Sequence, residues 1–193
     1  MVSASLVTAL NRGGIAVIPT DTLYGIVACA RNKDAAERLY TLRHTSSRKP
    51  FIILIDRIET VTDFGVILTT TQKQFLKKVW PGKVSVILPC TLKRFSYLHR
   101  GTQSLAFRVP KPKNLRALLR KTGPLVAPSA NSEGEKPAQT IREAKKYFGN
   151  AVALYVPGLV RRAPSSLVSL LGPTPVVIRR GTVNPRTLTE GTS

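Results

Sequence analysis

Acidic residues are scarce in this sequence of 193 residues. Its 10 Asp and Glu residues stand against 30 Lys and Arg, so the formal net charge is +20. A field of that sign attracts polyanions such as nucleotides and nucleic acids. A basic surface that is merely tolerated by an acidic or RNA-rich cellular environment is the alternative. The charge therefore points to a class of partner and names no activity.

Long apolar runs are also missing. No stretch approaches the roughly 20 apolar residues that a membrane-spanning helix needs, and the N-terminus lacks the basic-then-apolar pattern of a signal peptide. We therefore expect no membrane association and a cytoplasmic location. The two cysteines, Cys29 and Cys90, are expected to be buried and reduced. Together with two histidines they offer no metal-ligand cluster, so we expect no metal site built by the protein.

Three common site motifs are absent from the sequence. There is neither a GxxxxGK[ST] phosphate loop nor a GxGxxG dinucleotide fingerprint, and Gly13-Gly14 precedes a predicted strand and does not open a helix. His44 and His99 have no acidic residue nearby in the sequence, so a Ser/His/Asp triad has weak support. We expect His44 to lie in a solvated loop.

The residues that are present suit a globular α/β domain. Hydrophobic residues make up 42% and charged residues 21% of the chain, enough for one domain with a sizeable core. Apolar periodicity predicts helices over 3–12, 34–42, 70–80, 115–119 and 140–148. It predicts strands over 15–18, 26–30, 51–55, 84–88, 103–109, 125–127, 151–156, 166–171 and 176–178. Helices and strands interleave irregularly, so we expect a mixed sheet in one domain, residues 1–185, and a flexible tail, residues 186–193.

Polar groups follow several of the predicted strands at the point where each ends. These segments are Thr20-Asp21-Thr22, Arg108-Val109-Pro110, Pro128-Ser129-Ala130-Asn131 and Arg179-Arg180-Gly181. If these ends lie on one side of the sheet, they line a single basic cleft. Such a cleft suits a phosphorylated ligand, because Arg binds phosphate or carboxylate bidentately. Each segment alone is more often an ordinary turn, in which Asp21 and Thr22, for example, bond their own backbone.

The segment Pro19-Thr20-Asp21-Thr22-Leu23-Tyr24-Gly25 resembles the P-T-[DE]-T-x-Y-G signature of the YrdC/Sua5 family, the threonylcarbamoyl-AMP synthases. Further matches follow in the family's order. They are Lys49-Pro50-Phe51-Ile52, Trp80-Pro81-Gly82, Arg108-Val109-Pro110, Pro128-Ser129-Ala130-Asn131, Pro164-Ser165-Ser166-Leu167-Val168 and Ile178-Arg179-Arg180-Gly181. The resemblance covers residues 3 to 183 and is closest to the short, single-domain members.

This resemblance implies a fold, a reaction and partners. The fold is a YrdC-like domain with a twisted mixed sheet, flanked by helices, around a basic cavity. The reaction joins L-threonine, bicarbonate or CO2, and ATP into threonylcarbamoyl-AMP, releases pyrophosphate and usually requires Mg2+. A threonylcarbamoyl-transferase complex then passes the group to tRNA, forming t6A. These properties are expectations carried over from the family.

By motif position, the resemblance also implies two sets of binding residues. The threonine-binding set is Thr20, Thr22, Tyr24, Arg108 and Ser165. The ATP-binding set is Arg43, Lys49, Ser129, Asn131, Thr140 and Arg179.

One position departs from the family pattern. Members usually carry Lys and Arg seven and five residues before the proline that opens the next strand, which is Pro50 here. The two positions hold Arg43 and Thr45. Arg43 keeps the charge, but Thr45 cannot replace a guanidinium. Either Arg48 or Lys49 reaches into the site from the loop, or ATP binds more weakly.

Two other functions are compatible with the sequence. A YrdC-like module could bind RNA through its charge without catalysis, or with weak catalysis, because Thr45 impairs the nucleotide side. Carbamoyl-transfer domains of hydrogenase maturation proteins share the fold, but they usually lie in much longer chains with zinc-finger segments. No such segment is present in this sequence.

Overall fold

The computed structural model describes residues 2–45, 48–161 and 163–183. Its strands are β1 (Ala16–Pro19), β2 (Tyr24–Cys29), β3 (Ile52–Leu54), β4 (Val84–Pro89), β5 (Ser104–Arg108), β6 (Leu125–Val126), β7 (Leu154–Tyr155), β8 (Ser166–Ser169) and β9 (Val176–Arg179). Its α-helices are α1 (Ala4–Asn11), α2 (Lys33–Leu42), α3 (Thr70–Val79), α4 (Ser96–His99), α5 (Lys113–Thr122) and α6 (Ile141–Phe148). Short 3-10 helices are η1 (Ile58–Phe64), η2 (Lys93–Phe95) and η3 (Gly149–Ala151).

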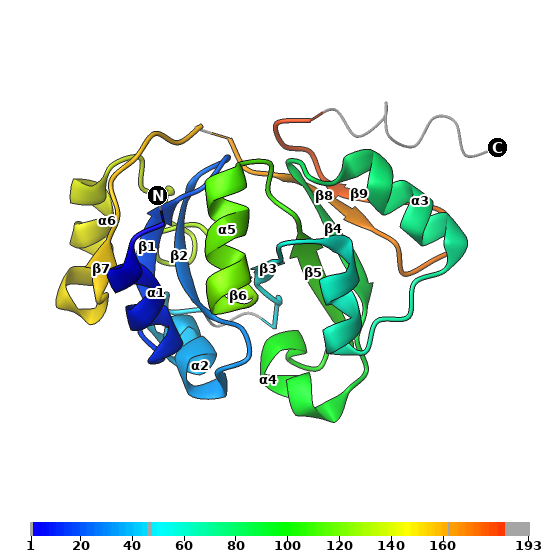
Figure 1. The fold of residues 1–193 in the computed structure, drawn as a ribbon, viewed down its shortest axis with the longest axis horizontal. Helices are drawn as coiled ribbons and strands as arrows, with labels where there is room; N and C mark the ends of the chain where they lie inside the picture. Colours follow the sequence, from blue (N-terminus) through cyan, green and yellow to red (C-terminus); the bar gives the residue numbers. More distant parts are fainter. Residues whose placement is uncertain (1, 46–47, 162, 184–193) are drawn as a thin grey trace.

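The described strands form one mixed sheet in the order β7-β1-β2-β6-β3-β5-β4-β8-β9. The pairs β1–β7, β3–β5 and β4–β8 are parallel, and the other neighbours run antiparallel. Helices flank the sheet along its length (Figure 1). The predicted α/β class with a mixed sheet is therefore confirmed. The predicted tail, residues 186–193, lies outside the described residues.

Strand alternation explains how helices cover both faces of the sheet around β1. Ala16 and Ile18 face one apolar cluster, together with Leu10 of α1 and Leu118 of α5. Successive side chains of a strand point to opposite faces, so Val17 belongs instead to the second cluster, which includes residues of α2 and α6. Helices α1 and α5 lie side by side in front of the sheet in Figure 1. Both faces of β2 are buried in consequence.

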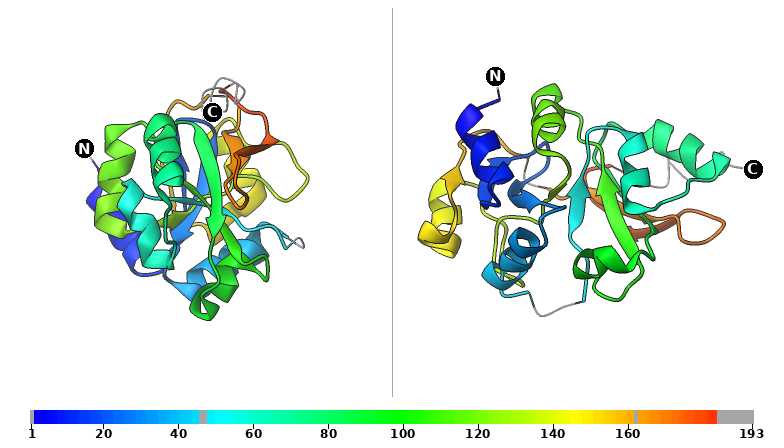
Figure 2. Two further views of the ribbon diagram at one scale, coloured as in Figure 1. Left: turned by 90° about the vertical axis from the view of Figure 1, so that its right-hand side faces the viewer. Right: turned by 60° about the horizontal axis from the view of Figure 1, so that its bottom comes forward.

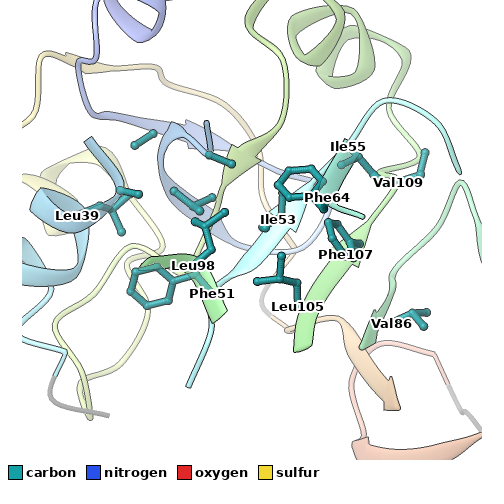
Figure 3. Close-up of a cluster of buried hydrophobic side chains, with 14 of the residues drawn as sticks. Leu39, Phe51, Ile53, Ile55, Phe64, Val86, Leu98, Leu105, Phe107 and Val109 are labelled. Atoms are coloured by element: carbon teal, nitrogen blue, oxygen red, sulfur yellow. The ribbon is translucent and has the colours of Figure 1, made fainter. Parts of the chain in front are cut away.

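A second part of the core lies under η1, α3 and α4. Phe64 of η1 packs edge-on against Phe107 of β5, with ring centroids 5.2 Å apart, and Figure 3 shows both rings beside Ile53 and Leu105. In α3, Phe75, Leu76 and Val79 are buried as the sequence predicts, while its lysines are exposed. This packing fixes the central strands, including β5, on which Arg108 is the last residue.

Several helix starts follow ordinary capping rules. Asn32 caps α2 by accepting a hydrogen bond from Ala35 N–H, and Thr69 and Gln72 form a capping box at α3. Helix α5 is longer than predicted, because the charged residues around its apolar stripe continue the helix to Thr122. The predictions missed η1 and α4, which are too short to show a helical period.

The two cysteines are free and buried, as predicted. Over the described ranges, none of the helices combines the length and apolarity that crossing a bilayer demands.

Candidate active site

A cavity of about 430 Å3 opens where several strands end. Its volume is in the range of small-molecule sites. The predicted convergence of strand ends is confirmed, because residues from all four predicted segments line it. The polar residues of its lining are Thr20, Thr22, Tyr24, Arg43, Lys49, Ser104, Arg108, Ser129, Ser165 and Arg179.

The turn between β1 and β2 is held by the hydroxyl of Thr20. This oxygen donates to Leu23 O at 2.6 Å and accepts from the N–H groups of Thr22 and Leu23, each at 3.2 Å. The Thr22 hydroxyl lies 3.0 Å from it. The sequence suggests Asp21 and Thr22 as the residues that bond the turn's backbone. Thr20 has that role instead, so both threonines are fixed at the cavity wall.

Asp21 forms the buried partner of Arg108. Its Oδ1 lies 2.5 Å from Nη1 of Arg108, and Oδ2 accepts from Lys111 N–H at 3.3 Å. The two side chains are only 7% and 5% exposed. The sequence alone assigns Asp21 no role in the site, because its partner is 87 residues away along the chain.

Arg43 reaches the cavity along a stack of rings. Its guanidinium lies 5.3 Å from the centroid of Phe51, whose ring stacks on Tyr40 at 3.8 Å. Its Nε donates to the carbonyl of Asn131 at 2.8 Å. Burial lowers the pKa of Arg43 from its ordinary value, and nearby Glu133 partly offsets this. Arginine stays protonated at neutral pH nonetheless, so Arg43 presents a fixed cation.

Ser165 of the lining lies at the centre of a small polar cluster. Its Oγ is 2.9 Å from Oγ of Ser85, which is fully buried, and Nη2 of Arg179 donates to its carbonyl at 3.1 Å. The position that ends the Arg179-Arg180-Gly181 motif has room only for glycine. A Cβ there would lie 2.4 Å from Pro164 O, so only glycine lets the segment that follows β9 approach Ser165 this closely.

Tyr24 lines the cavity and also fastens a distant segment. Its hydroxyl donates to Gly158 O at 2.5 Å and accepts from Gly158 N–H at 3.0 Å. The segment after β7, which crosses the top of the molecule in Figure 1, is therefore tied to β2 at this point. Its continuation carries Pro164 and Ser165 to the cavity.

Two residues of the predicted ATP-binding set do not line the cavity. Asn131 is buried beside it, and its amide donates to Ser132 O and Glu135 O while Oδ1 has no partner. It contacts the site through its carbonyl and Arg43. Thr140 is exposed, and its hydroxyl caps α6 by accepting from Glu143 N–H at 3.1 Å.

The loop that departs from the family pattern divides its residues between two pockets. Lys49 lines the main cavity with Arg43, whereas Arg48 is exposed and is not part of the lining. Thr45 lines a separate pocket with His44 and Arg100, and its buried Oγ1 has no hydrogen-bond partner. His44 is exposed, as predicted. Of the two compensating residues that the sequence suggests, the lining includes Lys49.

The described lining contains four cationic side chains and no acidic one. Asp21 neutralises one of these cations, Arg108. The basic character of the cavity therefore stays a prediction. Nowhere in the described ranges do three or more His, Cys, Asp or Glu side chains gather as metal ligands. Mg2+ prefers carboxylate oxygens among protein ligands, so the residues of this lining do not fit a Mg2+ ion held by the protein.

Comparison with known proteins places this arrangement of motifs in a family. A family model of Sua5, YciO and YrdC proteins, described as telomere recombination, matches residues 8–181. The chain belongs to this family. It is 33% identical over 164 residues to a threonylcarbamoyl-AMP synthase of Thiobacillus denitrificans, and the match covers 83% of this chain and 87% of that protein.

Two solved structures of family members share the fold. The crystal structure of P. abyssi Sua5 complexed with L-threonine has a TM-score of 0.87 at 22% identity, over 95% of this chain and 55% of that chain. This chain thus spans about half the length of that Sua5 protein. E. coli YciO has a TM-score of 0.84 at 24% identity, over 95% of this chain and 90% of that chain. At these identities the likeness establishes the fold, including the twisted mixed sheet.

Proposed function

We propose that this chain synthesises threonylcarbamoyl-AMP from L-threonine, bicarbonate or CO2, and ATP, and releases pyrophosphate. One observation carries the proposal: the family's signature turn, with Thr20 and Thr22, meets Arg108, Ser129 and Arg179 around a single cavity. The T. denitrificans relative, to which this chain is 33% identical, is named threonylcarbamoyl-AMP synthase. P. abyssi Sua5 has been crystallised with L-threonine.

The threonine side of the cavity is assigned to the turn and β5. Arg108 binds the threonine carboxylate, because a guanidinium can donate two parallel hydrogen bonds to it. Thr20, Thr22 and Ser165 offer hydroxyl groups to the polar atoms of the substrate. Tyr24 shapes the pocket through its ring, since its hydroxyl is occupied by Gly158.

The nucleotide side is assigned to Arg43, Lys49, Ser129 and Arg179. Three of these are cations, which suits a triphosphate. Asn131 supports this side indirectly, through the bond from Arg43 Nε to its carbonyl. Thr140 has no direct part in the proposal, because its hydroxyl is used as a helix cap.

The chemistry requires two anions to approach each other. The threonine amine adds to CO2 and loses a proton, which gives a carbamate. A carbamate oxygen then attacks the α-phosphorus of ATP, and the bond from that phosphorus to the pyrophosphate oxygen breaks. Fixed cations lower the repulsion between carbamate and phosphates, so orientation and charge stabilisation supply the catalysis. The described lining offers Mg2+ no carboxylate ligand, so we derive no step through a protein-bound metal.

The later partners are tRNA and a threonylcarbamoyl-transferase complex in the cytoplasm. The supporting observation is the basic surface of two helices. Exposed cations on α3 and α5 are Lys73, Lys77, Lys78, Lys113, Arg120 and Lys121. A surface of this kind attracts a phosphate backbone without reading its sequence.

Pyrophosphate release measured with each substrate omitted in turn tests the proposed reaction. We expect release from ATP only when L-threonine and bicarbonate are both present, and its loss in Arg108→Ala. Arg48→Ala, which alters an exposed cation outside the lining, is the matched control and should retain the activity. Pyrophosphate release that does not depend on threonine would reject the proposed synthesis. Tight tRNA binding without any pyrophosphate release would favour the alternative of a non-catalytic RNA-binding module.

A further inference from the structure

Asp21 and Arg108 form a charged pair that is shielded from solvent beside the cavity. Nη1 of Arg108 contacts Oδ1 of Asp21, and the two side chains are 5% and 7% exposed. Thr20, Thr22 and Arg108 line the cavity, but Asp21 between the two threonines does not. The Asp21 carboxylate thus contacts a residue of the lining, Arg108, without being part of the lining itself.

The opposite edge of the Arg108 guanidinium carries no bond. Nε is buried without a partner, and within the described residues Nη2 has no hydrogen bond either. Nε–H and one N–H of Nη2 point in the same direction, away from Nη1, and together they match the two oxygens of a carboxylate. Asp21 thus occupies one end of the guanidinium and leaves the other end, the fork, without a protein partner.

We propose that Asp21 is a positioning residue, which holds Arg108 by Nη1 so that its guanidinium is presented to the carboxylate of L-threonine. This inference rests on the proposed function. It assigns Asp21 no contact with substrate. It explains why the signature carries a carboxylate between two threonines that both face the cavity.

The backbone around Asp21 is suited to such a role. The Thr20 hydroxyl fixes the turn through three hydrogen bonds to Thr22 and Leu23. Lys111 N–H adds a second bond to Asp21, from the segment that follows β5. In the order of the sheet, β6 and β3 separate β2 from β5. The ion pair therefore sets the distance between the threonine hydroxyls of the turn and the guanidinium of β5.

The charge of Asp21 is needed as well as its shape. A buried guanidinium without a carboxylate is driven toward water, because burial penalises an unpaired charge. In Asp21→Ala, Arg108 can swing into the cavity or out of it, and the fork loses its direction. In Asp21→Asn, one oxygen remains to accept from Nη1, but the positive charge of Arg108 no longer has a negative partner.

Calorimetric titration of L-threonine and of ATP into four proteins tests the proposal: wild type, Asp21→Ala, Arg108→Ala and the double variant. We expect Asp21→Ala to weaken threonine binding about tenfold or more, with ATP affinity unchanged. In the Arg108→Ala background, replacing Asp21 by Ala should not weaken threonine binding any further. Asp21→Asn should fall between wild type and Asp21→Ala. Asp63→Asn, which removes the surface pair between Arg31 and Asp63, is the matched control and should bind threonine normally.

Two results would overturn this proposal and leave the proposed function standing. One is an unchanged threonine affinity in Asp21→Ala. The other is an equal loss of threonine affinity on replacing Asp21 in the presence and in the absence of Arg108. A parallel loss of ATP and threonine affinity would mean that Asp21 only supports the fold, and this too rejects it. If Asp21→Ala is unfolded by circular dichroism, the comparison of Asp21→Asn with wild type decides by the same criteria. A wild-type protein that binds no threonine overturns the proposed function and this inference together.

Discussion

At the scale of single residues, Arg43 and Arg108 are held at the cavity by different partners. Arg108 faces the Asp21 carboxylate, so its charge is matched before any ligand arrives. Arg43 is held by the Asn131 carbonyl and the Phe51 ring, and the nearby Glu133 carboxylate acts on it electrostatically. We assign Arg43, which lines the cavity together with Lys49, to the phosphates of ATP.

Lys49 and Arg48 provide a direct test of the nucleotide side. Lys49 lines the cavity and Arg48 does not, although the two cations are neighbours in one loop. We expect Lys49→Ala to weaken ATP binding by roughly 10-fold to 100-fold, since a hydrogen bond to a charged group contributes about 1.5–3 kcal/mol. Arg48→Ala should change it less than about twofold. Calorimetric titration of ATP measures both, and equal effects would remove Lys49 from the site.

The cysteines give a pH-dependent prediction. Burial raises the pKa of the Cys29 thiol and of the Cys90 thiol. Less thiolate is then present at pH near 8 than in an unfolded chain, and thiolate is the reactive form. We expect the folded protein to react slowly with a disulfide reagent, faster as the pH rises toward the raised pKa, and rapidly at both cysteines in urea. Folded and unfolded chains that react at one rate would contradict this.

The sequence predicts those site residues that follow strands within motifs. Thr20, Arg108, Ser129 and Arg179 belong to this group, and all of them line the cavity. It could not predict Ser85 or the pairing of Asp21, because these contacts join residues 80 and 87 positions apart. Such contacts depend on strand order, which no local pattern encodes.

At the scale of elements, the β1–β2 turn is built on one side chain. We expect Thr20→Ala to lower the free energy of unfolding by about 1–3 kcal/mol, because the turn's N–H groups lose their buried acceptor. Threonine binding should weaken as well, since Asp21 and Thr22 shift with the turn. Thr20→Ser keeps the hydroxyl and should remain near wild type in both. Urea unfolding and calorimetry measure the two effects, and a Thr20→Ala protein as stable as wild type contradicts the assignment.

Element boundaries were predictable where a cap or a breaker marks them. Helix α2 begins beside Asn32, and α3 ends at Val79, with Trp80 as its C-cap just before Pro81-Gly82. The run predicted over 151–156 contains only the short strand β7, because η3 occupies its beginning. β2 begins at Tyr24, earlier than predicted, so the end of the signature lies on a strand. The pairing with β1 determines where β2 begins, and the apolar periodicity of the sequence does not show it.

At the scale of the whole molecule, residues from distant parts of the sheet meet at the cavity. The turn after β1 and the end of β9 come from opposite parts of the strand order, and both contribute to the lining. Figure 2 shows the sheet twisting between these parts, with helices on its outer faces. The Asp21–Arg108 pair and the Tyr24–Gly158 bonds are cross-links that hold the walls in register.

The charge of +20 makes the proposed RNA binding testable through its salt dependence. We expect tRNA affinity to fall steeply and linearly on a logarithmic salt scale. Replacing Lys73, Lys77 and Lys78 of α3 by Glu should weaken tRNA binding and flatten that slope. Pyrophosphate release should be unchanged, because none of the three lines the cavity. Filter binding at several salt concentrations measures the slope, and an unaltered slope in the triple variant would place the RNA surface elsewhere.

The most direct test of the central claim follows the carbon atom of bicarbonate. The protein is incubated with ATP, L-threonine and isotope-labelled bicarbonate, and the adenylate product is identified by mass spectrometry. We expect labelled threonylcarbamoyl-AMP from the wild type and no labelled product from Arg108→Ala. If wild type consumes ATP but yields no labelled threonylcarbamoyl-AMP, or yields as much with Arg108 removed, the cavity does not perform this synthesis.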